Sequence, residues 1–133
     1  MKSYLLSACF LLLYQGAVHS GEVLESVIAE YQQQGNLSFS AASGKALWEQ
    51  EISFTKSSNT RNCASCHGNN LAQSGKHIKT GKIIKPMAPS INPERFTNKK
   101  KIEKWFFRNC KWTWGRECSP QEKGDILRYL SQQ

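Results

Sequence analysis

The feature that most constrains this chain is the pentapeptide Cys63-Ala64-Ser65-Cys66-His67. Two thiols at this spacing can each form a thioether with a haem vinyl group, and the adjacent histidine then lies beneath the iron as its proximal ligand. The other ring N–H of such a histidine is expected to meet a backbone carbonyl. The motif therefore predicts one covalently bound haem c, held by Cys63 and Cys66 and ligated by His67.

Two other chemistries use the same cysteine spacing. A thioredoxin-like redox pair needs a βαβ pattern around it, and the sequence has none. A structural zinc site needs a second Cys-x-x-Cys or a histidine pair at a suitable distance, and none follows. Haem attachment is therefore the favoured interpretation.

Residues 1–20 are predicted to be a cleaved signal peptide, which leaves a single cytochrome domain at 21–133. Lys2 precedes an apolar run from Tyr4 to Tyr14, and small residues follow before Gly21. The run is too short to span a bilayer. Lipoprotein processing at Cys9 is a weaker alternative, because the apolar run continues past that residue. Export to the periplasm is expected, and this compartment tolerates disulfides.

The formal net charge is +8, and Lys2 is the only charged residue of the signal peptide. Much of the basic excess lies between Lys76 and Arg116. This excess forms either a solvated basic face or a docking surface for an acidic redox partner. Nucleic-acid binding is not expected, because the chain is predicted to be exported and has no recognisable nucleic-acid-binding motif. We expect a monomer.

The spacing of apolar residues predicts an all-α domain with long loops. Few apolar residues are available for a chain of this length, so the domain needs a large apolar group at its centre, which a haem supplies.

A proline-rich loop is expected over 68–93, and a short loop from Cys110 to Cys118, whose thiols are left as a natural pair. Helices are expected over 22–34, over 43–51 with Ser43 as N-cap, over 98–109 with Asn98 as cap, and after Ser119, where Pro120 and Glu122 complete a capping box. The inward residues are expected to be Leu24, Val27, Ile28 and Tyr31, then Leu47 and Trp48, then Ile102, Trp105 and Phe106, and finally Ile126, Leu127 and Leu130.

Pattern alone favours Met87 as the ligand opposite His67. A methionine thioether raises the reduction potential of electron-transfer cytochromes, and Met87 lies in the proline-rich loop where such a ligand often occurs. His77 could instead give a bis-histidine site, but its polar, lysine-flanked position favours a surface histidine. Asn109 would not be selected from pattern, since asparagine is common at helix ends.

The C-terminal two-thirds of the chain resembles the sphaeroides haem protein family of class I c-type cytochromes. Before Cys63 the match is loose and rests on Gly44-x-x-Leu47-Trp48. The dense part of the match comprises Cys63-x-x-Cys66-His67-Gly68, Thr80-Gly81-Lys82-x-Ile84, Pro86-x-Ala88-Pro89-Ser90, Pro93-x-Arg95-Phe96-Thr97, Ile102-Glu103-Lys104-Trp105, Arg108-Asn109-Cys110, Gly115-Arg116-x-Cys118 and Glu122-Lys123-Gly124-Asp125.

The resemblance implies a class I cytochrome c fold with the side-chain oxygen of Asn109 as the sixth iron ligand. It also implies that Asn109 leaves when the iron is reduced, that a small gas such as O₂ or NO can then bind, and that Cys110 and Cys118 form a disulfide. The chemistry agrees, because a carboxamide oxygen is a hard, weak ligand that suits ferric better than ferrous iron. Trp112 and Trp114 are candidates for shaping the adjacent pocket.

Two functions stay open at this point. The first is a high-spin cytochrome that takes electrons from a partner, such as a di-haem cytochrome c or a membrane cytochrome b, and binds a gas once Asn109 detaches. The second is an ordinary electron carrier ligated by His67 and Met87. No general acid or base stands out, so a defined enzyme is not predicted, although oxygen- or NO-related activity is compatible with the first function.

Overall fold

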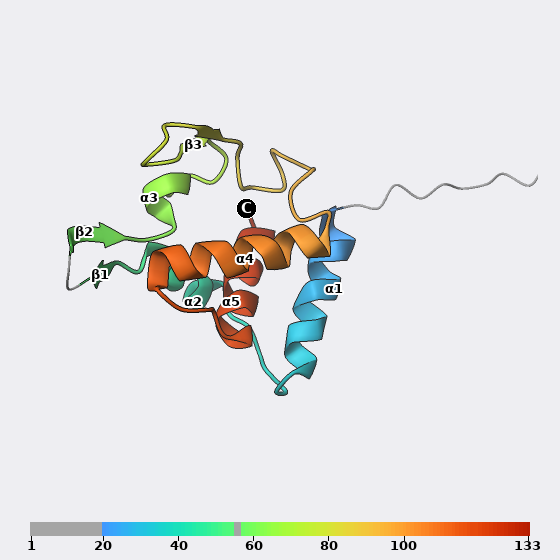
Figure 1. Ribbon diagram of the computed structural model, residues 1–133. Helices are drawn as coiled ribbons and strands as arrows, with labels where there is room; N and C mark the ends of the chain where they lie inside the picture. The colour runs from blue at the N-terminus through green and yellow to red at the C-terminus, as the bar shows by residue number, and fades with distance from the viewer. Residues whose placement is uncertain (1–19, 55–56) are drawn as a thin grey trace, which may run out of the picture.

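The computed structural model describes residues 20–54 and 57–133 (Figure 1). The predicted signal peptide and Cys9 lie outside the described residues, apart from Ser20. Within the described residues, no helix is long and apolar enough to cross a membrane. The helices are α1 (Ser20–Gln33), α2 (Ala41–Glu49), α3 (Ala64–His67), α4 (Lys99–Trp114) and α5 (Pro120–Ser131). The strands are β1 (Ile52–Phe54), β2 (Ser57–Arg61), β3 (Gly75–Lys76) and β4 (Ile83–Ile84).

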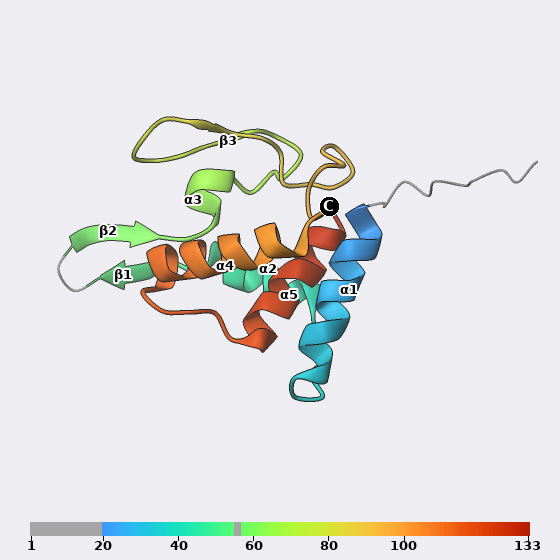
Figure 2. The ribbon, with the colours of Figure 1, turned by 45° about the vertical axis from the view of Figure 1, so that its right-hand side comes forward.

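Helix α5 lies at the centre of the molecule, between α1 and α2 (Figure 2). The predicted inward faces of α1 and α5 are confirmed, because Leu24, Val27 and Leu127 are almost completely buried. These side chains form one core cluster with Ile102 of α4. A second cluster joins Trp48, Leu71, Ala88, Ile126, Tyr129 and Leu130.

Helices α2 and α5 touch backbone to backbone at Gly44. A Cβ atom on this residue would lie only 2.0 Å from the carbonyl oxygen of Asp125, so no larger side chain fits there. The Asp125 carboxylate is itself buried and accepts a 2.7 Å hydrogen bond from the backbone N–H of Ser40. This contact brings the helix before the cysteine motif against the C-terminal helix.

Two of the predicted N-caps are confirmed, and one is wrong. The side chain of Asn98 accepts from the backbone N–H of Lys101, and the capping box of Ser119 and Glu122 is complete. Helix α2, however, starts earlier than expected. Its cap is Ser40, whose hydroxyl accepts from the backbone N–H of Ser43, the residue predicted to be the cap. Both serines suit a cap, and only the packing against Asp125 distinguishes them.

Helix α4 is longer than predicted. It continues past Cys110 to Trp114 and ends at Gly115, which has a left-handed backbone with φ of 70°. Trp112 and Trp114 therefore lie on the helix and not in a loop. Gly115 is the first residue after Asn109 that readily adopts the left-handed conformation needed to end a helix.

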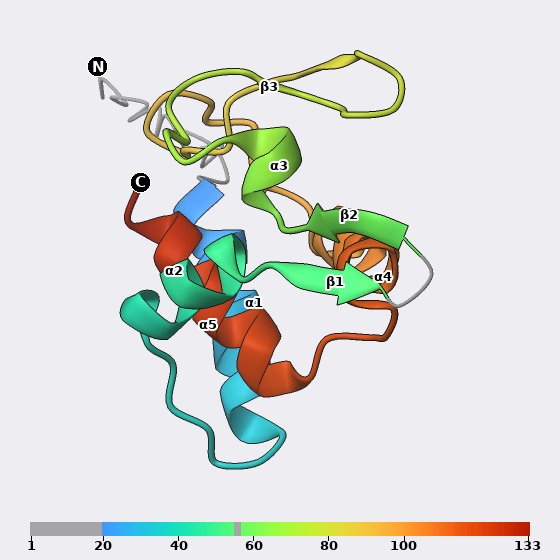
Figure 3. The same ribbon diagram turned by 90° about the vertical axis from the view of Figure 1, so that its left-hand side faces the viewer.

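The strands form two antiparallel hairpins that the prediction of an all-α domain missed. Strand β1 pairs with β2, and β3 pairs with β4. They are two to five residues long, too short to show a clear alternation of apolar and polar residues. The β3–β4 segment and α3 lie on one side of α4, and α5 lies on the other (Figures 1 and 3).

Candidate haem and ligand site

The cysteine motif forms a single helical turn. Cys63 begins it and Gly68 ends it with a positive φ of 74°, while the N–H of His67 donates to the carbonyl of Cys63 at 3.2 Å. The side chain of Asn62, just before the turn, accepts a 2.6 Å hydrogen bond from the backbone N–H of Ser65. Because residues three or four apart share one face of a helix, this turn brings Cys63 to the same side as Cys66 and His67.

Neither Cys63 nor Cys66 forms a disulfide. Burial, and to a smaller extent the neighbouring Cys66, raises the pKa of Cys63 to about 12. A redox-active cysteine pair works through a thiol whose pKa is lowered. The raised pKa of the Cys63 thiol therefore fits thioether attachment better than a thioredoxin-like function.

The imidazole of His67 is held in its neutral form. Burial, with a smaller effect from the Arg95 guanidinium, lowers the pKa of His67 to about 4. Neutral imidazole is the form that ligates a metal. The indole of Trp48 lies against it, with 5.3 Å between the ring centroids, and donates its own N–H to the carbonyl of Gly68 at 3.2 Å.

The expected hydrogen bond from His67 to a backbone carbonyl is not formed. Its Nδ1 atom is buried and has no hydrogen-bond partner among the described residues. A buried polar atom without a partner costs about 1–3 kcal/mol, so this position is poorly explained as simple core packing. Nor does the described part of the chain bring three or more His, Cys, Asp or Glu side chains together as a metal site, which leaves the zinc alternative without a ligand set.

The loop after His67 folds closely over the motif. A Cβ atom on Gly75 would lie 2.1 Å from the carbonyl oxygen of Cys66, so β3 approaches α3 through a residue without a side chain. The half-buried Arg95 is fixed by donating from Nε to the carbonyl of Pro86 at 2.9 Å and from Nη2 to that of Lys85 at 2.5 Å. The chain thus encloses the His67 side of the motif.

Met87 belongs to this same enclosure. Its backbone N–H donates to the carbonyl of Leu71 at 3.0 Å. Its side chain packs on the cluster that contains Trp48, and Trp48 contacts His67. His77 is half-buried and not purely a surface residue, and its Nδ1 accepts from the backbone N–H groups of Lys79 and Thr80.

Asn109 lies on α4, which passes below α3 in the view of Figure 1. Its side chain is exposed, and Trp112 follows one turn later. The indole of Trp112 lies 6.5 Å from the ring of His77, and the Arg61 guanidinium lies 4.8 Å above it. Arg61 and His77 come shortly before and after the cysteine motif, so this face of α4 is turned toward the segment that carries His67.

Cys110 and Cys118 are paired in the structure and buried, with 5.6 Å between their Cα atoms. That separation is the one a disulfide requires. The pair connects α4, at the residue after Asn109, to the segment that leads into α5.

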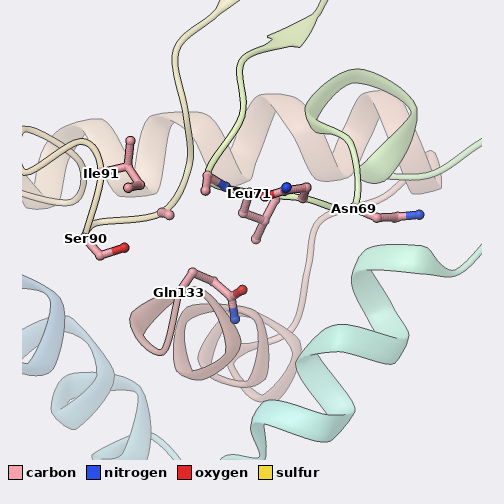
Figure 4. A pocket seen from close by; sticks show the side chains of 8 residues that line it. Asn69, Leu71, Ser90, Ile91 and Gln133 are labelled. Carbon is pink, nitrogen blue, oxygen red and sulfur yellow. Dashed lines mark hydrogen bonds between the residues drawn. The ribbon is translucent and has the colours of Figure 1, made fainter.

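A surface hollow of about 510 Å³ lies between the loop after His67 and the C-terminal residue (Figure 4). The buried Leu71 and Ala88 line it, together with the C-terminal Gln133. Cys63, His67 and Asn109 are not among its lining residues, although Leu71 and Ala88 belong to the cluster against which Cys63 packs.

Comparison with known proteins identifies the family. A family model described as a domain of unknown function matches residues 34–130. The cytochrome c-type protein SHP of Cereibacter sphaeroides is 39% identical over 107 residues, covering 80% of this chain and 81% of that protein. The chain belongs to the SHP family of monohaem cytochromes. It carries one covalently bound haem c, as predicted.

Solved structures agree with this membership in the SHP family. Oxidised SHP, described as an oxygen binding cytochrome c, matches with a TM-score of 0.76 and 37% identity, over 83% of this chain and 96% of that one. Oxidised cytochrome c'' from Methylophilus methylotrophus matches with a TM-score of 0.71 and 32% identity, over 84% and 92%. A solution structure of the same cytochrome c'', described as giving insights into haem-ligand detachment, has a TM-score of 0.69, over 86% and 93%. The helical cytochrome c fold predicted for the chain is therefore confirmed.

Sequence reasoning missed several contacts around the site. It did not find the tilted contact of Trp48 with His67, the hydrogen bonds from Arg95 to two carbonyls, or the contacts of Trp112 with Arg61 and His77. Only the position of Trp48 in a predicted helix gave a local signal for any of these. The other contacts join residues more than 15 positions apart or depend on loop geometry, which periodicity does not reveal.

Proposed function

We propose that this protein is a periplasmic, high-spin monohaem cytochrome c that accepts an electron and then binds a small diatomic ligand such as O₂ or NO. In this assignment Cys63 and Cys66 hold the haem through thioethers, and His67 ligates the iron on one side. Asn109 ligates it on the other side through its carboxamide oxygen. The haem supplies the redox change and the coordination position that the ligand occupies.

The observation that supports the proposal is that Asn109 shares a face of α4 with Trp112, which lies against the chain on both sides of the cysteine motif. Trp112 on this face contacts residues on both sides of the motif, at 4.8 Å for Arg61 and 6.5 Å for His77. A carboxamide oxygen is a hard ligand, which softer ferrous iron holds less tightly. Reduction therefore favours release of the Asn109 side chain.

The relatives support the same behaviour. SHP is described as oxygen binding, and a structure of cytochrome c'' is described in terms of haem-ligand detachment. We infer that the Cys110–Cys118 pair is a disulfide that limits how far Asn109 moves.

The electron donor is proposed to be another redox protein, such as a di-haem cytochrome c or a membrane cytochrome b. The segment from His67 to Pro93 contains lysines and no carboxylate residue, so it offers a basic surface close to the haem-binding turn. Basic surfaces attract acidic partners and speed their encounter.

Carbon monoxide binding tests the proposal. The protein is reduced anaerobically, and carbon monoxide is added while the visible spectrum is recorded. A high-spin ferrous spectrum that converts completely on adding carbon monoxide is expected. A low-spin ferrous spectrum that carbon monoxide leaves unchanged would refute the proposal and favour a carrier ligated by Met87.

Substitution of the two candidate ligands assigns the site. Asn109→Ala is expected to give a five-coordinate or water-ligated ferric form, because the carboxamide oxygen is lost. Met87→Leu keeps an apolar side chain of similar volume and is expected to leave the ferric and ferrous spectra unchanged. The opposite pattern would assign the ligand to Met87.

A further inference from the structure

Trp105 is one of the large apolar side chains that the fold leaves exposed. It was predicted to face inward, yet 51% of its surface is exposed. The Arg108 guanidinium lies 5.3 Å from the centre of its ring, within the range of a cation–π contact. Tryptophan is usually well buried in folded proteins, so a half-exposed indole held by a cation calls for an explanation.

The position of Trp105 on α4 gives that explanation. Trp105, Asn109 and Trp112 are spaced by four and three residues, so they form one stripe along the helix. Trp112, at one end of the stripe, contacts the chain on both sides of the cysteine motif. Asn109 lies between the two indoles, and Trp105 lies one turn before it, at the other end.

Exposure alone does not distinguish Trp105. Phe107, two residues further on, is also 51% exposed and is also covered by a cation, with Lys111 Nζ 3.8 Å from its ring centre. It points to another face of α4, however. There it lines a hollow of about 390 Å³ together with Phe106, Cys118 and Lys123, and neither Asn109 nor Trp112 belongs to that hollow.

We propose that Trp105 is the outer wall of the space that Asn109 vacates, and that it sets the size of ligand that can enter. This inference rests on the proposed function. The released carboxamide leaves a space suited to a diatomic molecule, and the indole beside it excludes bulkier ligands. Arg108 holds the indole in place, so both residues act on ligand entry without ligating the iron themselves.

The test compares Trp105→Ala with Phe107→Ala in the haem-loaded protein. Association of carbon monoxide, methyl isocyanide and tert-butyl isocyanide with the ferrous form is measured by stopped flow. Trp105→Ala is expected to speed tert-butyl isocyanide binding by roughly tenfold, which corresponds to about 1.4 kcal/mol of barrier. Carbon monoxide binding should rise much less, and Phe107→Ala should leave all three rates within about twofold of wild type.

Further measurements distinguish a steric role of Trp105 in ligand entry from a general effect of its substitution on the structure. Haem content, the ferric spectrum and the thermal unfolding midpoint are recorded for every variant. If Trp105→Ala does not fold, Trp105→Leu is used instead, with a smaller change of the same sign expected. Arg108→Gln should reproduce part of the change because it frees the indole.

Each outcome has a distinct meaning. If the Trp105 variants change the three rates no more than Phe107→Ala does, or change them all equally, the wall is refuted while the proposed function stands. If wild-type protein binds none of the three ligands, the proposed function fails and the wall fails with it.

Discussion

At the scale of single residues, Gly44 decides how closely α2 and α5 pack. A Cβ atom there would lie 2.0 Å from the carbonyl oxygen of Asp125 and 2.8 Å from the Cβ of Tyr129. One of these atoms belongs to a helix backbone, which cannot move aside as a flexible side chain can. The absence of a side chain at this position therefore holds the helix before the haem-binding turn against the C-terminal helix.

Gly44→Ala is expected to lower the free energy of unfolding by about 3 kcal/mol, the upper end of the usual cost of overpacking. The measurement is urea denaturation of the haem-loaded protein followed by circular dichroism. Ser43→Ala is the matched control, because Ser43 is exposed and is not the cap of α2. Equal losses in the two variants would contradict the close contact.

At the scale of helices, α5 begins with a complete capping box, the only one among the helices of the described residues. The Ser119 hydroxyl accepts from the backbone N–H of Glu122, and the Glu122 carboxylate accepts in return from the backbone N–H of Ser119 at 2.8 Å. The same carboxylate accepts from both terminal nitrogens of Arg116, at 2.6 and 2.8 Å. The first turn of the central helix is therefore stabilised by an ionised carboxylate.

These contacts make part of the stability dependent on pH. The hydrogen bonds from Arg116, and then those from Ser119, hold the pKa of Glu122 below its usual value of 4.5. A lowered folded-state pKa means that the stabilisation is complete above the unfolded pKa and is lost as the pH falls through the folded pKa. Wild type should therefore have a higher thermal unfolding midpoint than Glu122→Gln at pH 7, and the difference should disappear at acid pH.

The measurement is the thermal midpoint of both proteins between pH 3 and 7. Glu117→Gln serves as a control, since Glu117 is exposed and its ion pair with Lys111 lies at 3.3 Å outside the cap. A difference between wild type and Glu122→Gln that is the same at every pH would show that the carboxylate charge does not matter.

The helices were predictable to the extent that their signals are local. The apolar stripes of α1 and α5 and the capping box at Ser119 all involve neighbours within one or two turns, and the structure confirms them. The cap of α2 was misplaced because the choice between Ser40 and Ser43 is made by a contact with Asp125, far along the chain. The hairpins were missed for a similar reason, since strands of two to five residues depend on what they pair with.

The residues of the site were likewise predictable only where their signal is local in the sequence. Five consecutive residues were enough to predict haem attachment, because their chemistry depends on spacing alone. Asn109 came only from resemblance, because no periodicity distinguishes a ligand from any other polar residue at the end of a predicted helix. The outward position of Trp105 was not predictable, since apolar residues on a helix are expected to face the core.

At the scale of the whole molecule, two cross-links, one to the haem and one between two cysteines, hold two different parts of the site. The proposed thioethers fix the haem to the turn at Cys63–His67, and the Cys110–Cys118 pair ties the end of α4 to the start of α5. Asn109 lies next to the second cross-link. The position of the proposed ligand thus depends on a connection that is separate from the one that holds the haem.

Replacing both Cys110 and Cys118 by serine is expected to lower the free energy of unfolding by about 2–3 kcal/mol, the usual effect of closing a short loop. The ferric spectrum should also shift toward that of Asn109→Ala, because the end of α4 is less constrained. Urea denaturation and visible spectroscopy measure the two effects. A loss of stability with an unchanged ferric spectrum would show that the pair does not position Asn109.

The local character of α3 has a consequence for the order of assembly. Several of the hydrogen bonds within its turn join residues at most four positions apart, so this part of the site depends less on distant segments of the chain. Asn109, by contrast, reaches its place only when α4 has docked. On the proposed assignment, the residues that would attach the haem can therefore be in place before the residue that would close its second ligand position.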